Sequence, residues 1–136
     1  MARELGGAHV LVIDDEPFLI DLICTRLKMA GFHTTHARDG QRALEALRET
    51  PPDAVICDLN MPKLDGFGVL THMRNVPRLR GIPTMVLTAR NSTDDVKRAL
   101  SLGARDYLTK PFEDRVLLQR VARLLRRVPS AGPAQP

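Results

Sequence analysis

Short, continuously apolar runs alternate along the chain with longer segments in which apolar residues recur every three or four positions. The first run, residues 9–13, is rich in β-branched side chains, which is typical of a strand buried on both faces of a parallel sheet. After it, Pro17 suits the first turn of a helix whose apolar positions run from Leu19 to Leu27 before Gly31 ends it. The chain therefore begins with a strand followed by a helix.

This strand-to-helix unit repeats along the rest of the chain. Asp39 and Asp65 are candidate caps for the second and third helices, although two glycines follow Asp65 and weaken helix propensity there. Ser92 followed by Asp95 resembles an acidic variant of the capping box and predicts the start of the fourth helix. The expected strands are residues 9–13, 32–36, 54–57, 83–88 and 106–108, and the apolar face of the fifth helix runs from Leu117 to Val128.

Five strands alternating with five helices predict an α/β fold with an open, doubly wound parallel sheet, because right-handed crossovers place helices on both faces. A length of 136 residues favours one domain. We expect that domain over residues 1–128 and a flexible tail or linker, rich in Pro, Ala, Ser and Gly, over residues 129–136.

The net charge of +4 does not by itself indicate a nucleic-acid-binding protein. The excess lies in the last helix, where few aromatic residues accompany the basic ones, so a solvated helix face is the favoured interpretation and no direct nucleic-acid contact is expected. The basic residues concerned are Arg115, Arg120, Arg123, Arg126 and Arg127.

Cys24 and Cys57 lie in apolar runs without the spacing of a disulfide framework or a zinc site, so we expect both to be small buried side chains. The first residues lack the apolar stretch of a signal peptide, and no apolar run approaches the roughly 20 residues that cross a bilayer. A cytoplasmic protein without membrane contact is expected.

Polar residues follow the predicted strands at the point where each strand ends. Asp14 and Asp15 come after the first strand, Asp58 ends the third, Thr88 ends the fourth and Lys110 follows the fifth. In open parallel sheets, sites form beyond the carboxyl ends of the strands, so these five side chains are expected to converge. Three neighbouring carboxylates repel one another unless a cation neutralises them, which predicts a hard divalent ion.

Mg²⁺ fits these oxygen ligands, with Mn²⁺ as an alternative, whereas the lack of His and Cys partners disfavours zinc. Lys110 supplies a cation and Thr88 a hydroxyl donor, both suited to the oxygens of a transferring phosphoryl group. A carboxylate is then the nucleophile. These residue types alone do not decide which aspartate attacks.

From about His9 to Arg127 the sequence resembles the receiver domains of two-component signalling. The resemblance rests on four motifs in order: Asp14-Asp15-Glu16; Asp58-Leu59-Asn60-Met61-Pro62 with Asp65-Gly66; Thr88-Ala89; and Lys110-Pro111-Phe112. It implies a flavodoxin-like fold with strand order 2-1-3-4-5. It also implies a phosphoacceptor that takes its phosphoryl group from a histidine kinase or a histidine phosphotransfer protein.

The resemblance assigns roles to individual residues. Asp58 would be the phosphoacceptor, and Asp15 and Asp58 would ligate Mg²⁺ through their side chains. Asn60 would ligate through its backbone carbonyl and Asp14 through water. Thr88 would bind phosphoryl oxygens.

Lys110 would also bind phosphoryl oxygens and would precede Pro111 through a cis peptide bond, a form that has only a modest cost before proline. Tyr107 matches the switch aromatic of the family and would act together with Thr88. Phosphorylation would then change the surface around residues 92–127 and control an effector protein or domain, and a second copy of the chain is a further candidate partner.

Three residues beside the expected phosphoryl group are expected to tune its lifetime. These are Asn60, two positions past Asp58, the small Ala89, which leaves room for a donor, and Arg90, whose hydrogen bonds would slow hydrolysis.

Two other functions remain open from the sequence. The first is a phosphohydrolase with an aspartyl-phosphate intermediate, which is disfavoured because Asn60 stands where a second acidic residue would act as acid and base. The second is an interaction module of the same fold that works without phosphorylation. We expect no enzyme, but a domain that assists its own phosphorylation and autodephosphorylation.

Overall fold

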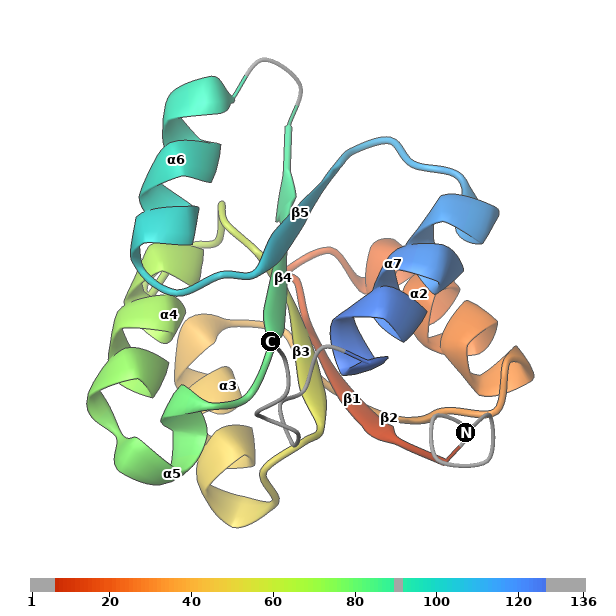
Figure 1. The fold of residues 1–136 in the computed structure, drawn as a ribbon, viewed down its shortest axis with the longest axis horizontal. Helices are drawn as coiled ribbons and strands as arrows, with labels where there is room; N and C mark the ends of the chain where they lie inside the picture. The colour runs from red at the N-terminus through yellow and green to blue at the C-terminus, as the bar shows by residue number, and fades with distance from the viewer. Residues whose placement is uncertain (1–6, 90–91, 127–136) are drawn as a thin grey trace, which may run out of the picture.

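The computed structural model describes residues 7–89 and 92–126, which form a parallel sheet with helices packed on both of its faces (Figure 1). The strand order is β2-β1-β3-β4-β5, and every neighbouring pair is parallel, as expected. The strands are β1 (His9–Ile13), β2 (His33–Ala37), β3 (Ala54–Asp58), β4 (Thr84–Thr88) and β5 (Asp106–Thr109). The helices are α2 (Pro17–Met29), α3 (Gly40–Glu49), α4 (Gly66–Asn75), α5 (Pro77–Arg80), α6 (Thr93–Ser101) and α7 (Asp114–Arg126).

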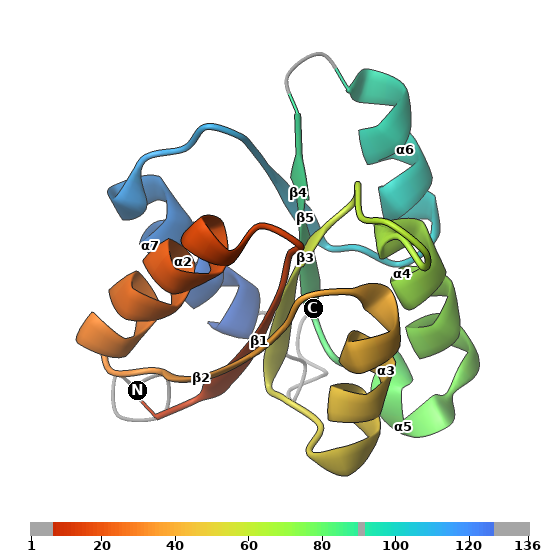
Figure 2. The same ribbon diagram turned by 180° about the vertical axis from the view of Figure 1, so that it is seen from behind.

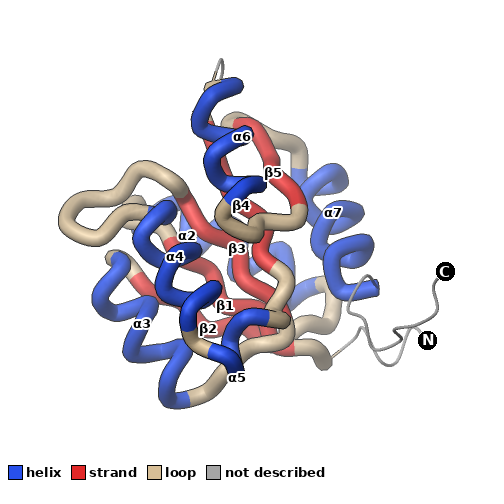
Figure 3. The backbone as a smooth tube through the Cα atoms, turned by 60° about the vertical axis from the view of Figure 1, so that its left-hand side comes forward, coloured by secondary structure: helices blue, strands red, loops and turns tan. Residues whose placement is uncertain are grey.

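Helices α2 and α7 cover one face of the sheet, and α3, α4, α5 and α6 cover the other (Figures 1 and 2). Viewed from the side, the sheet lies between these two helical layers (Figure 3). Each layer has its own apolar core, one built on α2 and α7 and another on α3 and α4. This three-layer arrangement explains why β1, β3 and β4 are buried on both faces, whereas the edge strand β2 is largely exposed.

The central strand β1 shows how one strand serves both cores. Val10 and Val12 belong to the cluster under α2 and α7, while Leu11 and Ile13 belong to the cluster under α3 and α4. All four are at most 1% exposed, and burial of each such side chain stabilises the fold by about 1.5–3 kcal/mol. The apolar, β-branched composition of this strand follows from burial on two sides.

The second strand begins one residue later than the sequence pattern predicts. The backbone N–H of Phe32 donates to the Leu27 carbonyl at 3.0 Å and so completes the end of α2 rather than the sheet. Gly31, with φ of +97°, makes this helix ending accessible because glycine tolerates the left-handed region. The Phe32 side chain still packs into the core under α2.

The described residues contain six helices where the sequence pattern predicts five. The additional helix, α5, has only four residues and begins at Pro77, and one turn is too short to show a helical repeat in the sequence.

The expected caps have different outcomes. The side chains of Asp39 and Asp65 accept the backbone N–H groups of Arg42 and Gly68, as predicted. Ser92 directly precedes α6, as predicted, but among the described residues its hydroxyl caps no backbone N–H of that helix. The caps that form have extended backbone, whereas Ser92 has a ψ of 45°, which departs from the extended conformation usual for capping residues.

Cys24 and Cys57 are buried and free, as expected. None of the described helices has the length and apolar character needed to cross a membrane. Val128 and the expected boundary between residues 128 and 129 lie outside the described residues.

Candidate functional site

Four strands of the sheet end at one edge, and polar residues stand at or directly after their carboxyl ends. Asp14 follows β1, Asp58 ends β3, Thr88 ends β4 and Lys110 follows β5. These strands are adjacent and parallel, so their carboxyl ends lie side by side. The topology thus brings together residues that are up to 96 positions apart in the sequence.

Three carboxylates form a compact group at this edge. One oxygen each from Asp14, Asp15 and Asp58 lies within 4.8 Å of the others. Asp14 is 0% exposed and Asp58 is 4% exposed, whereas Asp15 is open to solvent. A cluster of oxygen donors, two buried and one facing water, is compatible with a hard divalent cation that keeps some of its water.

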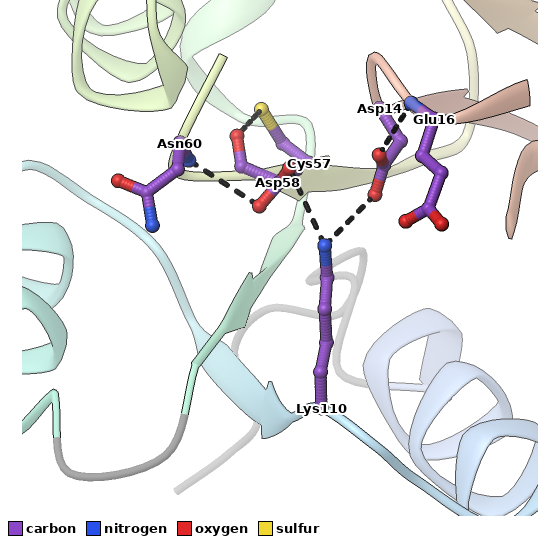
Figure 4. A network of polar contacts seen from close by, with 6 residues as sticks. All are labelled: Asp14, Glu16, Cys57, Asp58, Asn60 and Lys110. Atoms are coloured by element: carbon purple, nitrogen blue, oxygen red, sulfur yellow. Dashed lines mark hydrogen bonds and ion pairs between the residues drawn. The ribbon is translucent and has the colours of Figure 1, made fainter.

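Lys110 lies between the two buried carboxylates (Figure 4). Its Nζ is 3.2 Å from Oδ2 of Asp14 and 3.4 Å from Oδ2 of Asp58. The backbone N–H of Lys110 also donates to the Thr88 carbonyl at 2.7 Å, which fixes the chain where β4 and β5 end. The peptide bond between Lys110 and Pro111 is cis, as expected from the family resemblance.

The pKa values of Asp58 and Lys110 are both raised. Burial, and after it the charge of Asp14, raises the pKa of Asp58 to about 6, while Lys110 acts in the opposite direction. Burial lowers the pKa of Lys110, but the nearby charges of Asp58 and Asp14 outweigh burial and leave that pKa above its usual value. The site therefore holds a protonated ammonium beside an Asp58 carboxyl group that is costly to ionise.

The two oxygens of Asp14 are both held by donors from the protein. Oδ1 accepts the backbone N–H of Glu16 at 2.9 Å, and Oδ2 faces Lys110. Oδ1 of Asp58 accepts the backbone N–H of Asn60 at 3.3 Å. The side chains of Asp14 and Asp58 are thereby oriented by turns that immediately follow their strands.

Helix α4 begins close to the backbone of Asp58 and Leu59 because its first residue, Gly66, has no side chain. A Cβ at Gly66 would lie 2.7 Å from the Leu59 Cα and closer still to the Asp58 carbonyl. No other residue fits without displacing backbone. The glycine that weakens helix propensity in the sequence is thus required where α4 starts against the functional strand.

Thr88 and Tyr107 line the same cavity, which has a volume of about 460 Å³. Thr88 is 2% exposed, Tyr107 is 42% exposed, and Ala89 also contributes to the cavity lining. Arg90, which the sequence places beside the expected phosphoryl group, lies outside the described residues.

The sequence does not predict the ion-pair network that Asp106, the residue before Tyr107, forms with two arginines of α7. Buried Asp106 accepts hydrogen bonds from Arg120 at 3.1 Å and Arg123 at 2.8 Å, and Arg120 also donates to the Tyr107 carbonyl at 2.7 Å. Arg123 is exposed, as the solvated-face interpretation expects, and Arg120 is partly buried. That interpretation does not include the ion pairs that both arginines form with Asp106. The signal in the sequence is a single acidic residue beside Tyr107, which gains meaning only once β5 and α7 are placed together.

Comparison with known proteins gives a consistent result. The family model described as the response regulator receiver domain matches residues 10–122. The chain is 44% identical over 127 residues to transcriptional regulatory protein PrrA of Mycobacterium leprae, covering 93% of this chain and 54% of that protein. The chain thus spans about half the length of the curated relatives it matches.

Solved structures show the same fold. The signal receiver domain of a signal transduction histidine kinase from Syntrophus aciditrophicus is 35% identical, with a TM-score of 0.84 over 96% of this chain and 98% of that one. The receiver domain of sensor histidine kinase PA1611 from Pseudomonas aeruginosa is 29% identical, with a TM-score of 0.81 over 88% of this chain and 98% of that one. That structure has a magnesium ion coordinated in its active site cleft.

Proposed function

The chain belongs to the response regulator receiver domain family, and we propose that it is a Mg²⁺-dependent phosphoacceptor switch whose phosphorylated residue is Asp58. The observation that carries this proposal is the Lys110 ammonium held between the buried carboxylates of Asp14 and Asp58. Phosphoryl transfer depends on positioning and on neutralisation of charge, and this arrangement provides both around one nucleophile.

In the proposed transfer, a carboxylate oxygen of Asp58 attacks the phosphorus of a phosphohistidine on a histidine kinase or a histidine phosphotransfer protein. An O–P bond forms and the P–N bond breaks, and the imidazole leaving group keeps the electron pair. Lys110, kept protonated by its acidic neighbours, neutralises one phosphoryl oxygen, and the Thr88 hydroxyl donates to another. Attack by water on the phosphorus later releases inorganic phosphate and restores the Asp58 carboxylate.

Mg²⁺, or Mn²⁺ in its place, supplies positive charge to the phosphoryl oxygens when it is bound. Asp15 and Asp58 would hold the ion through their side chains, Asn60 through its backbone carbonyl and Asp14 through water. The donors already present on both Asp14 oxygens support this indirect role. The magnesium ion in the similar PA1611 receiver domain also supports the assignment.

We propose that Thr88 and Tyr107 pass the signal to the surface around residues 92–127. A phosphoryl group on Asp58 draws the Thr88 hydroxyl toward its new oxygens, and the cavity that Thr88 and Tyr107 both line provides room for the tyrosine ring to move inward. The effector protein or domain, or a second copy of the chain, would recognise the changed surface. We propose no direct contact with membranes or nucleic acid. We propose further that the protein acts in the cytoplasm.

The proposed role is that of a phosphoacceptor that assists its own phosphorylation and dephosphorylation, rather than an enzyme that turns over a separate substrate. Asn60 supports this distinction because an amide cannot serve as the acid and base of a phosphohydrolase. A phosphorylation-independent module of the same fold is the alternative. The burial of Asp14 and Asp58 disfavours it, because two buried carboxylates are costly and a purely structural module has no use for them.

Incubation with Mg²⁺ and acetyl phosphate, followed by intact mass measurement, tests the proposal. The expected result is one added phosphoryl group, lost when EDTA replaces Mg²⁺ and absent in Asp58→Asn. Hydrolysis of many acetyl phosphate molecules without a measurable adduct would favour the phosphohydrolase. No adduct and no hydrolysis would favour the phosphorylation-independent module.

A further inference from the structure

The loop between β3 and α4, residues 59–65, includes Asn60, whose carbonyl is a proposed Mg²⁺ ligand, and the end of the loop next to α4 packs against two helices. Leu64 lies at that end. A Cβ at Gly40, the first residue of α3, would stand 2.6 Å from the Leu64 Cβ and closer to the Leu64 carbonyl oxygen. A Cβ at Gly68 on α4 would stand 3.0 Å from the Leu64 Cγ and closer to Cδ1. Leu64 is therefore seated between two glycines on different helices.

The near end of the same loop is also fixed. The backbone N–H of Gly66 donates to the Leu59 carbonyl at 3.1 Å, and the N–H of Asn60 donates to the Asp58 carboxylate at 3.3 Å. Between these points Lys63 has a φ of +65°, a conformation that a non-glycine residue adopts only when its surroundings hold it there. The loop is thus constrained at both ends and passes through an unfavourable backbone conformation at its tip.

We propose that Leu64, seated between Gly40 and Gly68, is the positioning residue that holds the β3–α4 loop in the shape in which the Asn60 carbonyl ligates the metal. The inference rests on the proposed function, because it assigns that carbonyl to Mg²⁺. Leu64 packs against the core cluster under α3 and α4 but does not itself belong to the acidic group. Leu64 keeps the loop ordered in the metal-free protein, so that Mg²⁺ binding does not have to order it.

The effect of removing the Leu64 side chain on Mg²⁺ affinity can be estimated. If Leu64 no longer holds the loop, metal binding has to supply the cost of ordering roughly one backbone residue, which corresponds to a weakening of about tenfold in the dissociation constant. The carboxylates of Asp14, Asp15 and Asp58 remain in place, so binding weakens without being abolished.

The test compares Leu64→Ala with Leu44→Ala, a matched truncation on α3 that packs against the same core cluster. The dissociation constant for Mg²⁺ is measured by isothermal titration calorimetry at a temperature where circular dichroism shows each variant folded. Hydrogen exchange of the amides in residues 60–65 is measured in the metal-free protein. We expect Leu64→Ala to raise the constant about tenfold and to speed exchange in the loop. Leu44→Ala should leave the dissociation constant and the exchange rate unchanged. Leu64→Met, which keeps a large apolar side chain, should have wild-type values of both.

Gly40→Ala provides a second, independent route, because its new methyl group pushes the Leu64 backbone instead of removing the side chain. It should weaken Mg²⁺ binding to a similar extent. Wild-type affinity in both Leu64→Ala and Gly40→Ala, or equal weakening in Leu44→Ala, overturns the inference while the proposed function stands. Absence of Mg²⁺ binding in the wild-type protein overturns the proposed metal site and the inference together.

Discussion

Replacement of Asp58 by asparagine removes a buried negative charge while keeping the size and shape of the side chain. Asp58 is 4% exposed and shares the edge of the sheet with buried Asp14, and Lys110 offsets only part of their mutual repulsion. We therefore expect the metal-free Asp58→Asn protein to be more stable than the wild type at neutral pH, even though the mutation destroys the proposed phosphorylation site.

The magnitude follows from the pKa of Asp58, which is raised from 3.8 to about 6. Each pKa unit corresponds to about 1.4 kcal/mol, so ionising Asp58 in the folded protein costs up to about 3 kcal/mol. That pKa already includes the attraction to Lys110, but asparagine is itself a buried polar side chain that carries a desolvation cost, so the expected gain in the free energy of unfolding is about 1–3 kcal/mol. For a domain of this size that corresponds to a rise in Tm of about 3–10 °C.

The pH dependence has a definite sign. Because the folded-state pKa is raised, the folded protein binds more protons than the unfolded chain between pH 3.8 and about 6. The stability contributed by protonated Asp58 is therefore lost as the pH rises through this window. The advantage of Asp58→Asn should be small near pH 4, grow across the window and remain constant above pH 7.

The assay is urea denaturation followed by circular dichroism, in EDTA, at several pH values from 4 to 8. Asp15→Asn is the matched control, since it makes the same acid-to-amide change at the solvent-exposed member of the cluster and should have a smaller effect. Saturating Mg²⁺ should stabilise the wild type more than Asp58→Asn, because the variant lacks a ligand. A wild-type protein as stable as Asp58→Asn at pH 8 without Mg²⁺ would refute the reasoning about the buried charge.

Contacts in and around the site lead to three further predictions. Gly66→Ala places a methyl group against the backbone of β3 and should lower the free energy of unfolding by about 1–3 kcal/mol, measured by urea denaturation. Arg120→Ala removes one of two arginines bound to buried Asp106 and should cost about 1–3 kcal/mol in the same assay. Its control is Arg115→Ala on the same helix, where the arginine side chain is 77% exposed and its removal should cost almost nothing. Lys110→Ala should slow phosphorylation by acetyl phosphate roughly 10²-fold, measured by the time course of the mass adduct, because it removes a charged donor; an unchanged rate would exclude Lys110 from the transfer step.

The fold and the acidic cluster could be predicted from the sequence because both depend on patterns that are local in the chain. Apolar runs mark the strands, and the rule that the carboxyl ends of parallel strands meet at one edge is enough to predict that Asp14, Asp58 and Lys110 are neighbours. The residue roles drawn from the family resemblance are of a different kind. They stay predictions until phosphorylation and metal binding are measured.

What the sequence could not provide are contacts between elements that are distant in the chain and carry no repeat. Gly40 looks like an ordinary first residue of a helix, and its need to be glycine follows only from the position of Leu64 against it. In the same way, Arg120 and Arg123 follow a spacing that suits a solvated helix face. Only the packing of α7 on β5 reveals that they share Asp106.

The alternation of β1 between two cores also restricts how this chain can vary over evolutionary time. Val12 faces one helical layer and Ile13 the other, so a one-residue insertion or deletion within β1 would exchange the two sets of side chains. It would also shift Asp14 by about 3.3 Å along the strand and turn it away from Lys110. Substitutions that alter side-chain volume can be absorbed by repacking of the core. A change in the length of β1 cannot, because it moves Asp14 away from its partners in the site.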